Sequence, residues 1–257
     1  MTGQGMRSDM LKGRTIVVTG SARGVGADIA RACAERGARV VLGDILVERG
    51  EAMAQSLRDA GAAARFHPLD LADPASIQTF ADAVRDQEGV LHGLVNNGAI
   101  ATNVGGMAFE DIEIDLWDRV MRVNVRGTWL MTTALSPLFD PAGGQIVNVA
   151  SDTALWGAPR LLAYVASKGA VLSMTRSLAR ELGPRRIGVT VIAPGIMRNE
   201  ATEYVPAARH ELYEQGRAAP GPQYPTDIVD TVAFLLTPGA LALTGQTLPV
   251  NAGFVFA

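Results

Sequence analysis

Short apolar runs alternate with longer amphipathic stretches along most of this chain. The runs are rich in Val, Ile and Thr and have the length of buried strands, and they occupy residues 15–19, 39–42, 64–66, 91–95, 145–149, 188–192 and 247–250. The stretches between them predict helices over residues 25–36, 47–60, 113–138 and 160–182. A further helix is expected to begin at Pro74, with Asp73 as its N-cap.

Apolar strands separated by helices indicate a parallel sheet that is covered on both faces. We therefore expect an α/β fold with a doubly wound parallel sheet of the Rossmann type, in a single domain over residues 13–257 that follows a disordered tail over residues 1–12. Ligands bind such a sheet at the carboxyl ends of its strands, where the strand order reverses. Residues 198–225 break the alternation, and form either a mobile lid over that crevice or a plain surface insertion.

Composition and charge narrow the class of protein. Apolar residues make up 48% of the 257 and charged residues 19%, which is typical of a globular rather than a disordered chain. The formal charge of −3 provides no basic surface for nucleic acid, and no apolar run reaches the ~18 residues that cross a membrane. The single cysteine, Cys33, favours a reducing cytoplasm and reads as a packed, inert thiol. His67, His92 and His210 share no ligand spacing, so we expect no metal site.

A glycine-rich turn follows the first predicted strand and opens a helix. Gly20, Gly24 and Gly26 allow a tight turn and let a pyrophosphate approach the helix N-terminus, where unpaired N–H groups favour negative charge. The strand–turn–helix context is what distinguishes a dinucleotide site from a chance glycine motif. We therefore expect this turn to bind a dinucleotide.

Two charged residues bear on which dinucleotide binds. Asp44 ends the second strand, where a carboxylate accepts the ribose hydroxyls of NAD and repels the 2′-phosphate of NADP. Arg23, inside the glycine turn, argues the other way because a guanidinium pairs with phosphate. The repulsion acts wherever the arginine points, so NAD is favoured over NADP.

Tyr164 and Lys168 stand four residues apart, which places an ammonium beside a phenol on one face of a helix. A free tyrosine has a pKa near ~10, and a neighbouring cation favours the phenolate. We therefore expect Lys168 to lower the pKa of Tyr164 toward the range useful for proton transfer. Taken alone, such a pair occurs by chance on many helices.

An ordered set of motifs along the chain indicates that the Tyr164/Lys168 pair is functional. After the glycine turn come Asp70, Asn96-Asn97-Gly98-Ala99, Asn124, Ser151, Tyr164 with Lys168, and Pro194-Gly195. In this order the chain resembles the short-chain dehydrogenase/reductase family, in its single-domain form of about 250 residues, from about residue 13 to the C-terminus. The resemblance implies that Tyr164 exchanges a proton with the substrate oxygen and that Lys168 holds the nicotinamide ribose. It also implies that Ser151 hydrogen-bonds the substrate oxygen and that Asn124 helps hold a water linked to Lys168.

The resemblance also implies a set of cofactor-binding residues. These are Gly20, Ser21, Arg23, Gly24, Val25, Gly26, Asp44, Asp70, Leu71, Asn97, Gly98, Tyr164, Lys168, Pro194, Gly195 and Asn199. The chain departs from the family at two places. Gly98-Ala99 stands where the family usually has Ala-Gly, so the backbone near the adenosine is expected to differ. Asn199 stands where the family commonly has Thr.

The substrate is less well defined by the sequence. Trp156, Tyr204 and Tyr213, together with Leu155 and Leu212, fall in segments that flank the crevice in similar enzymes. They either line a pocket for an apolar or aromatic secondary alcohol and its ketone, or pack the lid or a subunit contact. No cluster of Arg or Lys is evident near the crevice that would call for a phosphorylated or carrier-bound substrate.

These inferences converge on an NAD-dependent alcohol dehydrogenase or carbonyl reductase acting on a small molecule. An NADP-dependent carbonyl reductase of the same family and a catalytically silent nucleotide sensor are the alternatives. A sugar-nucleotide epimerase shares the Tyr/Lys chemistry but usually adds a substrate domain. The resemblance further suggests a homotetramer that packs through residues 113–138 and 160–182, with residues 250–257 as a further contact.

Overall fold

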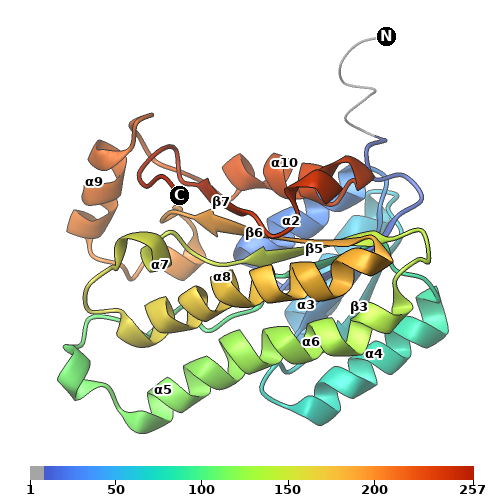
Figure 1. Ribbon diagram of the computed structural model, residues 1–257, viewed down its shortest axis with the longest axis horizontal. Helices are drawn as coiled ribbons and strands as arrows, with labels where there is room; N and C mark the ends of the chain where they lie inside the picture. The colour runs from blue at the N-terminus through green and yellow to red at the C-terminus, as the bar shows by residue number, and fades with distance from the viewer. Residues whose placement is uncertain (1–8) are drawn as a thin grey trace.

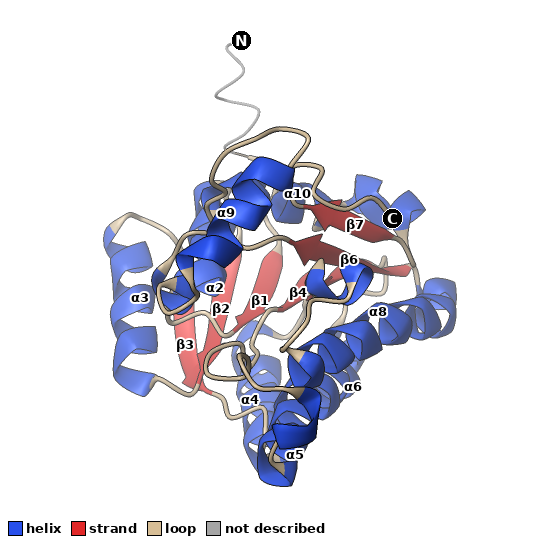
Figure 2. Cartoon of the chain, turned by 90° about the vertical axis from the view of Figure 1, so that its left-hand side faces the viewer, coloured by secondary structure: helices blue, strands red, loops and turns tan. Residues whose placement is uncertain are grey.

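The computed structural model describes residues 9–257 of the chain. Within that part, seven strands form one parallel sheet in the order β3-β2-β1-β4-β5-β6-β7 (Figure 2). The strands are β1 Thr15–Thr19, β2 Arg39–Asp44, β3 Ala64–Pro68, β4 Gly93–Asn96, β5 Gly144–Val149, β6 Ile187–Pro194 and β7 Thr247–Val250. The predicted doubly wound sheet is confirmed, and its strand order reverses between β1 and β4.

Helices connect the strands and cover both faces of the sheet (Figure 1). They are α2 Gly24–Glu35, α3 Val47–Asp59, α4 Pro74–Glu88, α5 Ile114–Met121, α6 Thr128–Leu135, α7 Thr153–Trp156, α8 Leu162–Leu182, α9 Ala207–Gly216 and α10 Thr226–Leu235. The predicted start of α4 is confirmed, because the Asp73 side chain accepts a hydrogen bond from the Ala75 N–H at 2.9 Å. The sequence pattern did not predict α9 or α10.

Two apolar layers hold the helices against the sheet. On one face α2, α3 and α10 pack over strand residues such as Ile16 and Val40, both fully buried. On the other face α4, α6 and α8 pack over residues such as Val17 and Leu94. Because successive residues of a strand point to opposite faces, each apolar strand contributes to both layers. The sheet is thereby fixed from both sides, and its carboxyl edge offers a rigid platform for a site.

The predicted helix over residues 113–138 is interrupted. Between α5 and α6 the chain forms a π-helical turn over Arg122–Gly127, and a 3₁₀ turn follows over Ser136–Leu138. At the end of the π turn, a Cβ added to Gly127 would lie only 2.7 Å from the Leu71 carbonyl oxygen, so glycine permits this close approach. Such π turns are frequent at functional sites, and this one carries Asn124.

The amino-terminal segment is more ordered than the sequence indicated. The first eight residues of the predicted tail lie outside the described part of the chain. Leu11, however, is fully buried in the α2 face of the core, and its N–H donates to the Arg36 carbonyl at 2.9 Å. The predicted tail therefore ends before Leu11, because an apolar side chain at this position gains by burial. Among residues 9–257, no helix has the length and apolar character needed to cross a membrane.

Candidate active site

A cavity of about 1200 Å³ opens at the carboxyl edge of the sheet. Its wall is made by the turns after β1, β2, β4, β5 and β6, and by the segment after residue 198. Of the predicted catalytic, cofactor and substrate residues, all but Ser21, Asn124 and Leu155 lie in this wall. Ser21 is fully buried and its hydroxyl faces the Gly43 carbonyl at 3.4 Å, which is why it does not reach the cavity.

The glycine turn owes its shape to close backbone contacts. A Cβ added to Gly26 would lie 2.0 Å from the Gly20 carbonyl oxygen and 2.5 Å from Asn97 Nδ2. That amide nitrogen donates to the carbonyls of both Thr19 and Gly20 at 3.0 Å. Gly20 and Gly24 have φ of 64° and 56°, which other residues rarely adopt. Asn97 therefore braces the turn from the neighbouring strand end, and the cradle stays open for a phosphate group.

The exchanged Gly98-Ala99 pair fits this packing without strain. A Cβ added to Gly20 would lie 2.6 Å from the Gly98 Cα, so the two backbones touch directly. Gly98 also donates its N–H to Thr19 Oγ1 at 3.0 Å. Ala99 is absent from the described residues with positive φ, so it adopts an ordinary backbone conformation. At Gly98 itself, an added Cβ would lie 2.7 Å from Leu71 Cδ1.

Two carboxylates, Asp44 at the end of β2 and Asp70 after β3, lie in the cavity wall. Asp44 is 8% exposed, and its two oxygens accept hydrogen bonds from the N–H groups of Ala22 and Leu46, each at 2.9 Å. These bonds tie the glycine turn to the end of β2 and keep a negative charge beside it. Asp70 accepts from the Ala72 N–H at 2.8 Å and lies in the same wall.

Arg23 is already paired across the cavity rim. Its guanidinium lies 3.1 Å from Glu200 Oε1, and Arg49 lies 3.2 Å from the same oxygen. All three side chains are about half exposed, so these ion pairs are screened by water. The sequence did not single out Glu200 or Arg49. Glu200 nevertheless brings a third carboxylate, after Asp44 and Asp70, to the cavity wall.

Tyr164, Lys168 and Ser151 come together from two elements. Tyr164 and Lys168 lie one turn apart on α8, and Ser151 follows β5. The Lys168 Nζ lies 5.6 Å from the centre of the Tyr164 ring and donates to the Val149 carbonyl at 2.7 Å. Ser151 hydrogen-bonds Tyr164 and accepts from the Thr153 hydroxyl at 2.9 Å. The arrangement gathers a phenol, an ammonium and a hydroxyl on one wall of the cavity.

The pKa values in this group differ from the sequence prediction. Burial raises the pKa of Tyr164 to about 12, and the hydrogen bond from Ser151 opposes the shift only in part. Burial also lowers the pKa of Lys168 to about 8. The expected lowering of the Tyr164 pKa by Lys168 is therefore not found, because loss of solvation dominates and the ammonium is directed at a backbone carbonyl. At neutral pH this phenol is a proton donor.

Asn124 lies behind the cavity wall and is 1% exposed. Its side chain accepts from the Ile100 N–H at 2.8 Å and donates to the Ile100 carbonyl at 3.1 Å. The same amide donates to Ser167 Oγ at 3.0 Å, next to Lys168. Asn124 thus fixes the turn after β4 against α8, and the water-holding role implied by the family stays a prediction.

Residues 198–225, called the lid below, contact the cavity rim at separate points. The Tyr204 hydroxyl donates to the Ala101 carbonyl at 2.9 Å, on the turn after β4. Arg209 donates to the Pro159 carbonyl at 3.3 Å and lies over the Trp156 ring. Lid residues also line the cavity. The segment thus lies at the mouth of the cavity, and its action as a lid stays a prediction.

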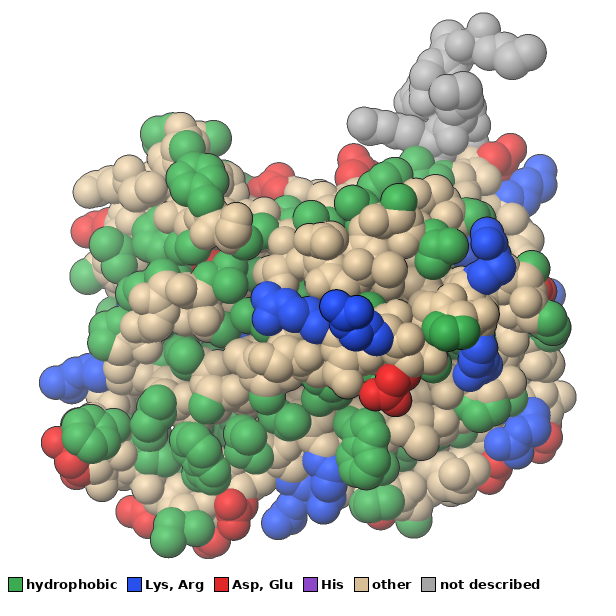
Figure 3. Space-filling model, viewed as in Figure 1, with side chains coloured by type: hydrophobic (Ala, Val, Ile, Leu, Met, Phe, Trp, Pro, Cys, Tyr) green, Lys and Arg blue, Asp and Glu red, His purple; other side chains and the backbone are tan. Residues whose placement is uncertain are grey.

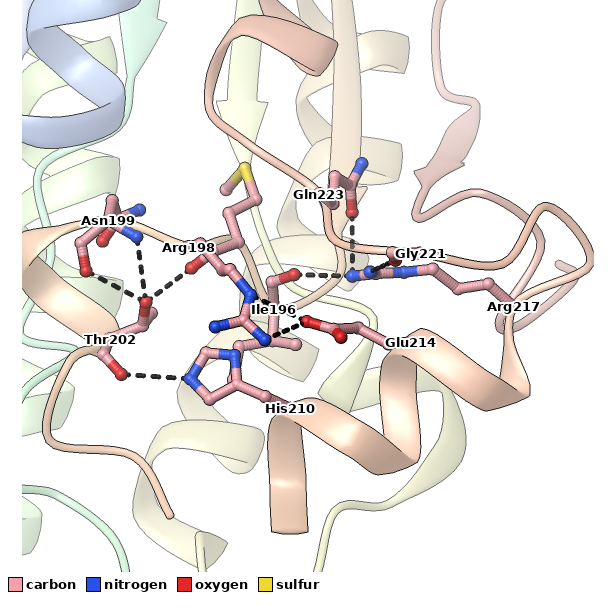
Figure 4. Close-up of polar contacts among 10 residues, drawn as sticks. Ile196, Arg198, Asn199, Thr202, His210, Glu214, Arg217, Gly221 and Gln223 are labelled. Carbon is pink, nitrogen blue, oxygen red and sulfur yellow. Dashed lines mark hydrogen bonds and ion pairs between the residues drawn. The ribbon is translucent and has the colours of Figure 1, made fainter. Parts of the chain in front are cut away.

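Internal polar contacts shape the lid (Figure 4). The Arg217 guanidinium donates to the carbonyls of Ile196 and Gly221 at 2.6 and 2.5 Å, which joins the two ends of the lid. Arg198 and Glu214 form an ion pair at 2.5 Å. Because these bonds close within the lid, α9 is held in a defined orientation at the same end of the sheet as α7 (Figure 1).

Trp156, Tyr204 and Tyr213 line the cavity, but the indole N–H and both hydroxyl groups are hydrogen-bonded to other protein groups. Trp156 Nε1 donates to the Tyr213 hydroxyl at 3.0 Å. Tyr213 is 1% exposed, stacks on Phe254 and donates its hydroxyl to Asp152 at 2.8 Å. Tyr213 thus packs the lid more than it faces a substrate, whereas Tyr204 is about half exposed.

Asp152 and Asn251 were not predicted from the sequence. Both follow strand ends at the carboxyl edge, and the Asn251 amide donates to Asp152 Oδ2 at 3.2 Å. Polar residues at that edge are the available sequence signal. The sequence expectation of no Arg or Lys cluster near the crevice did not single out Arg119, Arg160 and Arg209, which all line the cavity. They come from distant parts of the chain, so no local run of charge revealed them.

Thiol and metal chemistry find no support at the cavity. Cys33 is buried in α2, and burial raises the pKa of its thiol to about 12. Among residues 9–257, no three His, Cys, Asp or Glu side chains gather as a metal-binding group.

Comparison with known sequences gives a match along the whole site. The family described as enoyl-(acyl carrier protein) reductase matches residues 20–255. A 3-alpha-(or 20-beta)-hydroxysteroid dehydrogenase of Mycobacterium tuberculosis is 36% identical over 251 residues, covering 96% of this chain and 92% of the relative.

Solved structures give the same result. A blue fluorescent protein from a metagenomic library, in complex with NADPH, superposes with a TM-score of 0.88 at 33% identity over 96% of this chain and 99% of its own. A 3-ketoacyl-(acyl-carrier-protein) reductase from Brucella melitensis, complexed with NADH, gives 0.87 at 31% identity over 96% of this chain and 100% of its own. Both cofactors thus occur among similar folds.

Proposed function

Because the chain belongs to the short-chain dehydrogenase/reductase family, we propose that it transfers a hydride between NAD(H) and a secondary alcohol or its ketone. One observation carries the proposal: Tyr164, Ser151 and Lys168 share a cavity with the glycine turn. A hydride carrier held at the turn and a proton donor in the same cavity are what this reaction requires.

The proposed preference for NAD rests on the charged residues around the glycine turn. Asp44 keeps a carboxylate beside the glycine turn, and the guanidinium of Arg23 is paired with Glu200, which it shares with Arg49. A 2′-phosphate would be repelled by the Asp44 carboxylate and would have to displace Glu200 from Arg23. The glycine turn itself fits a pyrophosphate, since a Cβ at Gly26 would collide with its backbone.

Each residue of the catalytic group has a role that follows from its surroundings. The bound nicotinamide would supply the hydride for ketone reduction or accept it in alcohol oxidation. Tyr164, protonated at neutral pH, donates its proton to the substrate oxygen, and the Ser151 hydroxyl stabilises the charge that develops there. The Lys168 ammonium favours the phenolate left behind.

The substrate class follows from the cavity wall. Leu161, Val205 and Leu212, with the rings of Trp156 and Tyr204, give an apolar surface, and the similar Mycobacterium protein is named a hydroxysteroid dehydrogenase. We therefore propose an apolar or aromatic secondary alcohol and its ketone. A second candidate is a carrier-linked or anionic ketone.

That second candidate is favoured by Arg119, Arg160 and Arg209 in the same wall. Three guanidinium groups there would attract a substrate that carries phosphate or carboxylate.

A homotetramer in a reducing cytoplasm is also proposed. Large apolar side chains lie exposed along the face formed by α5, α6 and α8 (Figure 3), among them Ile114 at 76%, Trp129 at 51% and Leu162 at 44%. Scattered apolar residues are normal on a surface, but an apolar face of this extent favours a subunit contact. Light scattering that gives the mass of a monomer would exclude this assembly.

The test is turnover of a panel of ketones and alcohols with NADH, NADPH and their oxidised forms, followed by nicotinamide absorbance. The panel includes steroid ketones and 3-ketoacyl thioesters, which separate the two substrate classes. Tyr164→Phe should reduce kcat by about 10²–10⁴-fold and leave NADH binding within twofold. Tyr224→Phe, a half-exposed tyrosine away from the cavity, is the matched control. A protein that binds NADH but turns over nothing in the panel, with or without Tyr164, is a nucleotide sensor.

A further inference from the structure

A buried carboxylate directly follows Ser151 and has no part in the proton transfer described above. Asp152 is fully buried, and its N–H donates to the Pro194 carbonyl at 2.9 Å. The main chain next to Ser151 is therefore fixed between the ends of β5 and β6. Buried carboxylates are rare unless they are paired or hydrogen-bonded, so the partners of Asp152 indicate its purpose.

The two oxygens of Asp152 hold two separate segments. Oδ1 accepts from the Tyr213 hydroxyl at 2.8 Å, on lid helix α9, and Oδ2 accepts from the Asn251 amide at 3.2 Å, just after β7. The Tyr213 ring is stacked on Phe254, with centroids 4.1 Å apart. One carboxylate thus joins the catalytic strand end, the lid and the carboxyl-terminal segment.

The hydrogen-bond pattern fits the ionised form of the group. Each oxygen faces a donor, so a proton on either oxygen would point at another hydrogen. The Tyr213 hydroxyl also accepts from Trp156 Nε1 at 3.0 Å, which directs its own proton toward Asp152. Protonation of Asp152 therefore costs at least one of the bonds that hold the lid.

The charged and titratable groups around Asp152 come from several elements. Arg217, after α9, attracts its charge, and the Thr153 amide of α7 adds a hydrogen bond. The charge in turn raises the pKa values of Tyr164 on α8 and of Tyr213 on α9. Burial outweighs the favourable contacts and raises the pKa of Asp152 to about 6. The group therefore changes charge at a pH at which the enzyme can be assayed.

We propose that Asp152 is a positioning residue whose carboxylate anchors α9 through Tyr213, so that α9 keeps its place at the substrate side of the cavity only while this hydrogen bond is made. The proposal rests on the proposed function for the identity of the site. The anchor itself is defined by contacts within the chain, so it can be tested without a substrate.

The first experiment is hydrogen exchange of the α9 amides, residues 207–216, in the intact protein without substrate. Tyr213→Phe keeps the ring stacked on Phe254 and removes only the hydroxyl. It should speed exchange of α9 by about tenfold at pH 7.5, because a hydrogen bond to a charged group is lost. Tyr224→Phe should leave α9 unchanged. Asp152→Ala, which removes the acceptor of this hydrogen bond, should speed exchange of α9 to at least the same extent.

The second experiment separates this anchor from a general structural role. Tyr213→Phe should raise the substrate KM by about tenfold and leave the NADH dissociation constant within twofold. Asp152→Asn, which keeps an acceptor for the Tyr213 hydroxyl, should raise KM less than Tyr213→Phe does. Equal α9 exchange in Tyr213→Phe and Tyr224→Phe, or a KM that Tyr213→Phe leaves at the wild-type value, overturns the proposal. Absence of wild-type turnover counts against the proposed function alone, since the exchange result stands by itself.

Discussion

Gly26→Ala tests the glycine turn more directly than any loss of charge. The added Cβ would lie 2.0 Å from the Gly20 carbonyl oxygen and 2.5 Å from Asn97 Nδ2, and neither atom is free to move. Overpacking in a tight site costs about 1–3 kcal/mol, and each of the two Asn97 bonds that must shift contributes about 0.5–1.5 kcal/mol net. We expect the free energy of unfolding to fall by about 2–6 kcal/mol.

Thermal and denaturant unfolding measure this loss of stability, and fluorescence titration with NADH measures the affinity of the glycine turn for the cofactor. The variant should unfold at least about 4 °C lower and bind NADH at least tenfold more weakly, because the turn no longer fits a pyrophosphate. Gly169→Ala is the control: its added Cβ, in the middle of α8, meets nothing within 4 Å, so it should gain about 0.5–1 kcal/mol. A Gly26→Ala protein with wild-type stability and NADH affinity would refute the tight-contact explanation of this turn.

Three further predictions concern charge. Glu200→Gln, which frees Arg23, should raise the affinity for NADPH relative to NADH severalfold in direct titrations. Glu203→Gln, in the same exposed segment, is the control and should leave this ratio of affinities unchanged. If the ratio is equal in both variants, Glu200 has no part in cofactor choice. The pKa of Asp152 is about 6 in the folded protein, against 3.8 for an unperturbed aspartate. Its contribution to the free energy of unfolding is therefore fully present below pH 3.8 and is lost as the pH rises through 6. At neutral pH this loss amounts to about 3 kcal/mol. Unfolding titrations at pH 4 and 7 should show that decline in the wild type and a smaller one in Asp152→Asn. Cys33, with a thiol pKa of about 12, should resist a thiol reagent in the native protein and react at once after unfolding; rapid native labelling would contradict its burial.

The sequence pattern predicted the sheet well because its signals are local. Apolar runs, the glycine turn and the Asp73 cap each depend on neighbouring residues, and the structure bears out the sheet and the cap. The π turn at Asn124 was not predictable from periodicity, since α and π turns share the same apolar residues over such a short stretch. Helix α9 was missed because its sequence mixes polar and apolar residues without a clear stripe.

The site was predictable as a set of residues but not as an electrostatic environment. Tyr164 and Lys168 were found by their spacing, yet burial reverses the expected direction of the Tyr164 pKa. Burial, like the ion pair of Glu200 with Arg23, depends on residues that are far apart in sequence. Long-range contacts also bring Tyr213 to Asp152, so the sequence assigned Tyr213 to the substrate when its hydroxyl is bound to the protein.

The carboxyl-terminal segment has a practical consequence for anyone who produces this enzyme. Phe254 stacks on Tyr213, and Asn251 holds Asp152, only a few residues from Ala257 (Figure 1). A purification tag fused after Ala257 would therefore be attached near α9, which lines the cavity, and could alter measured specificity as a mutation would. An amino-terminal tag leaves these contacts intact, and enzyme preparations that differ only in tag position would reveal how strongly the last residues govern substrate choice.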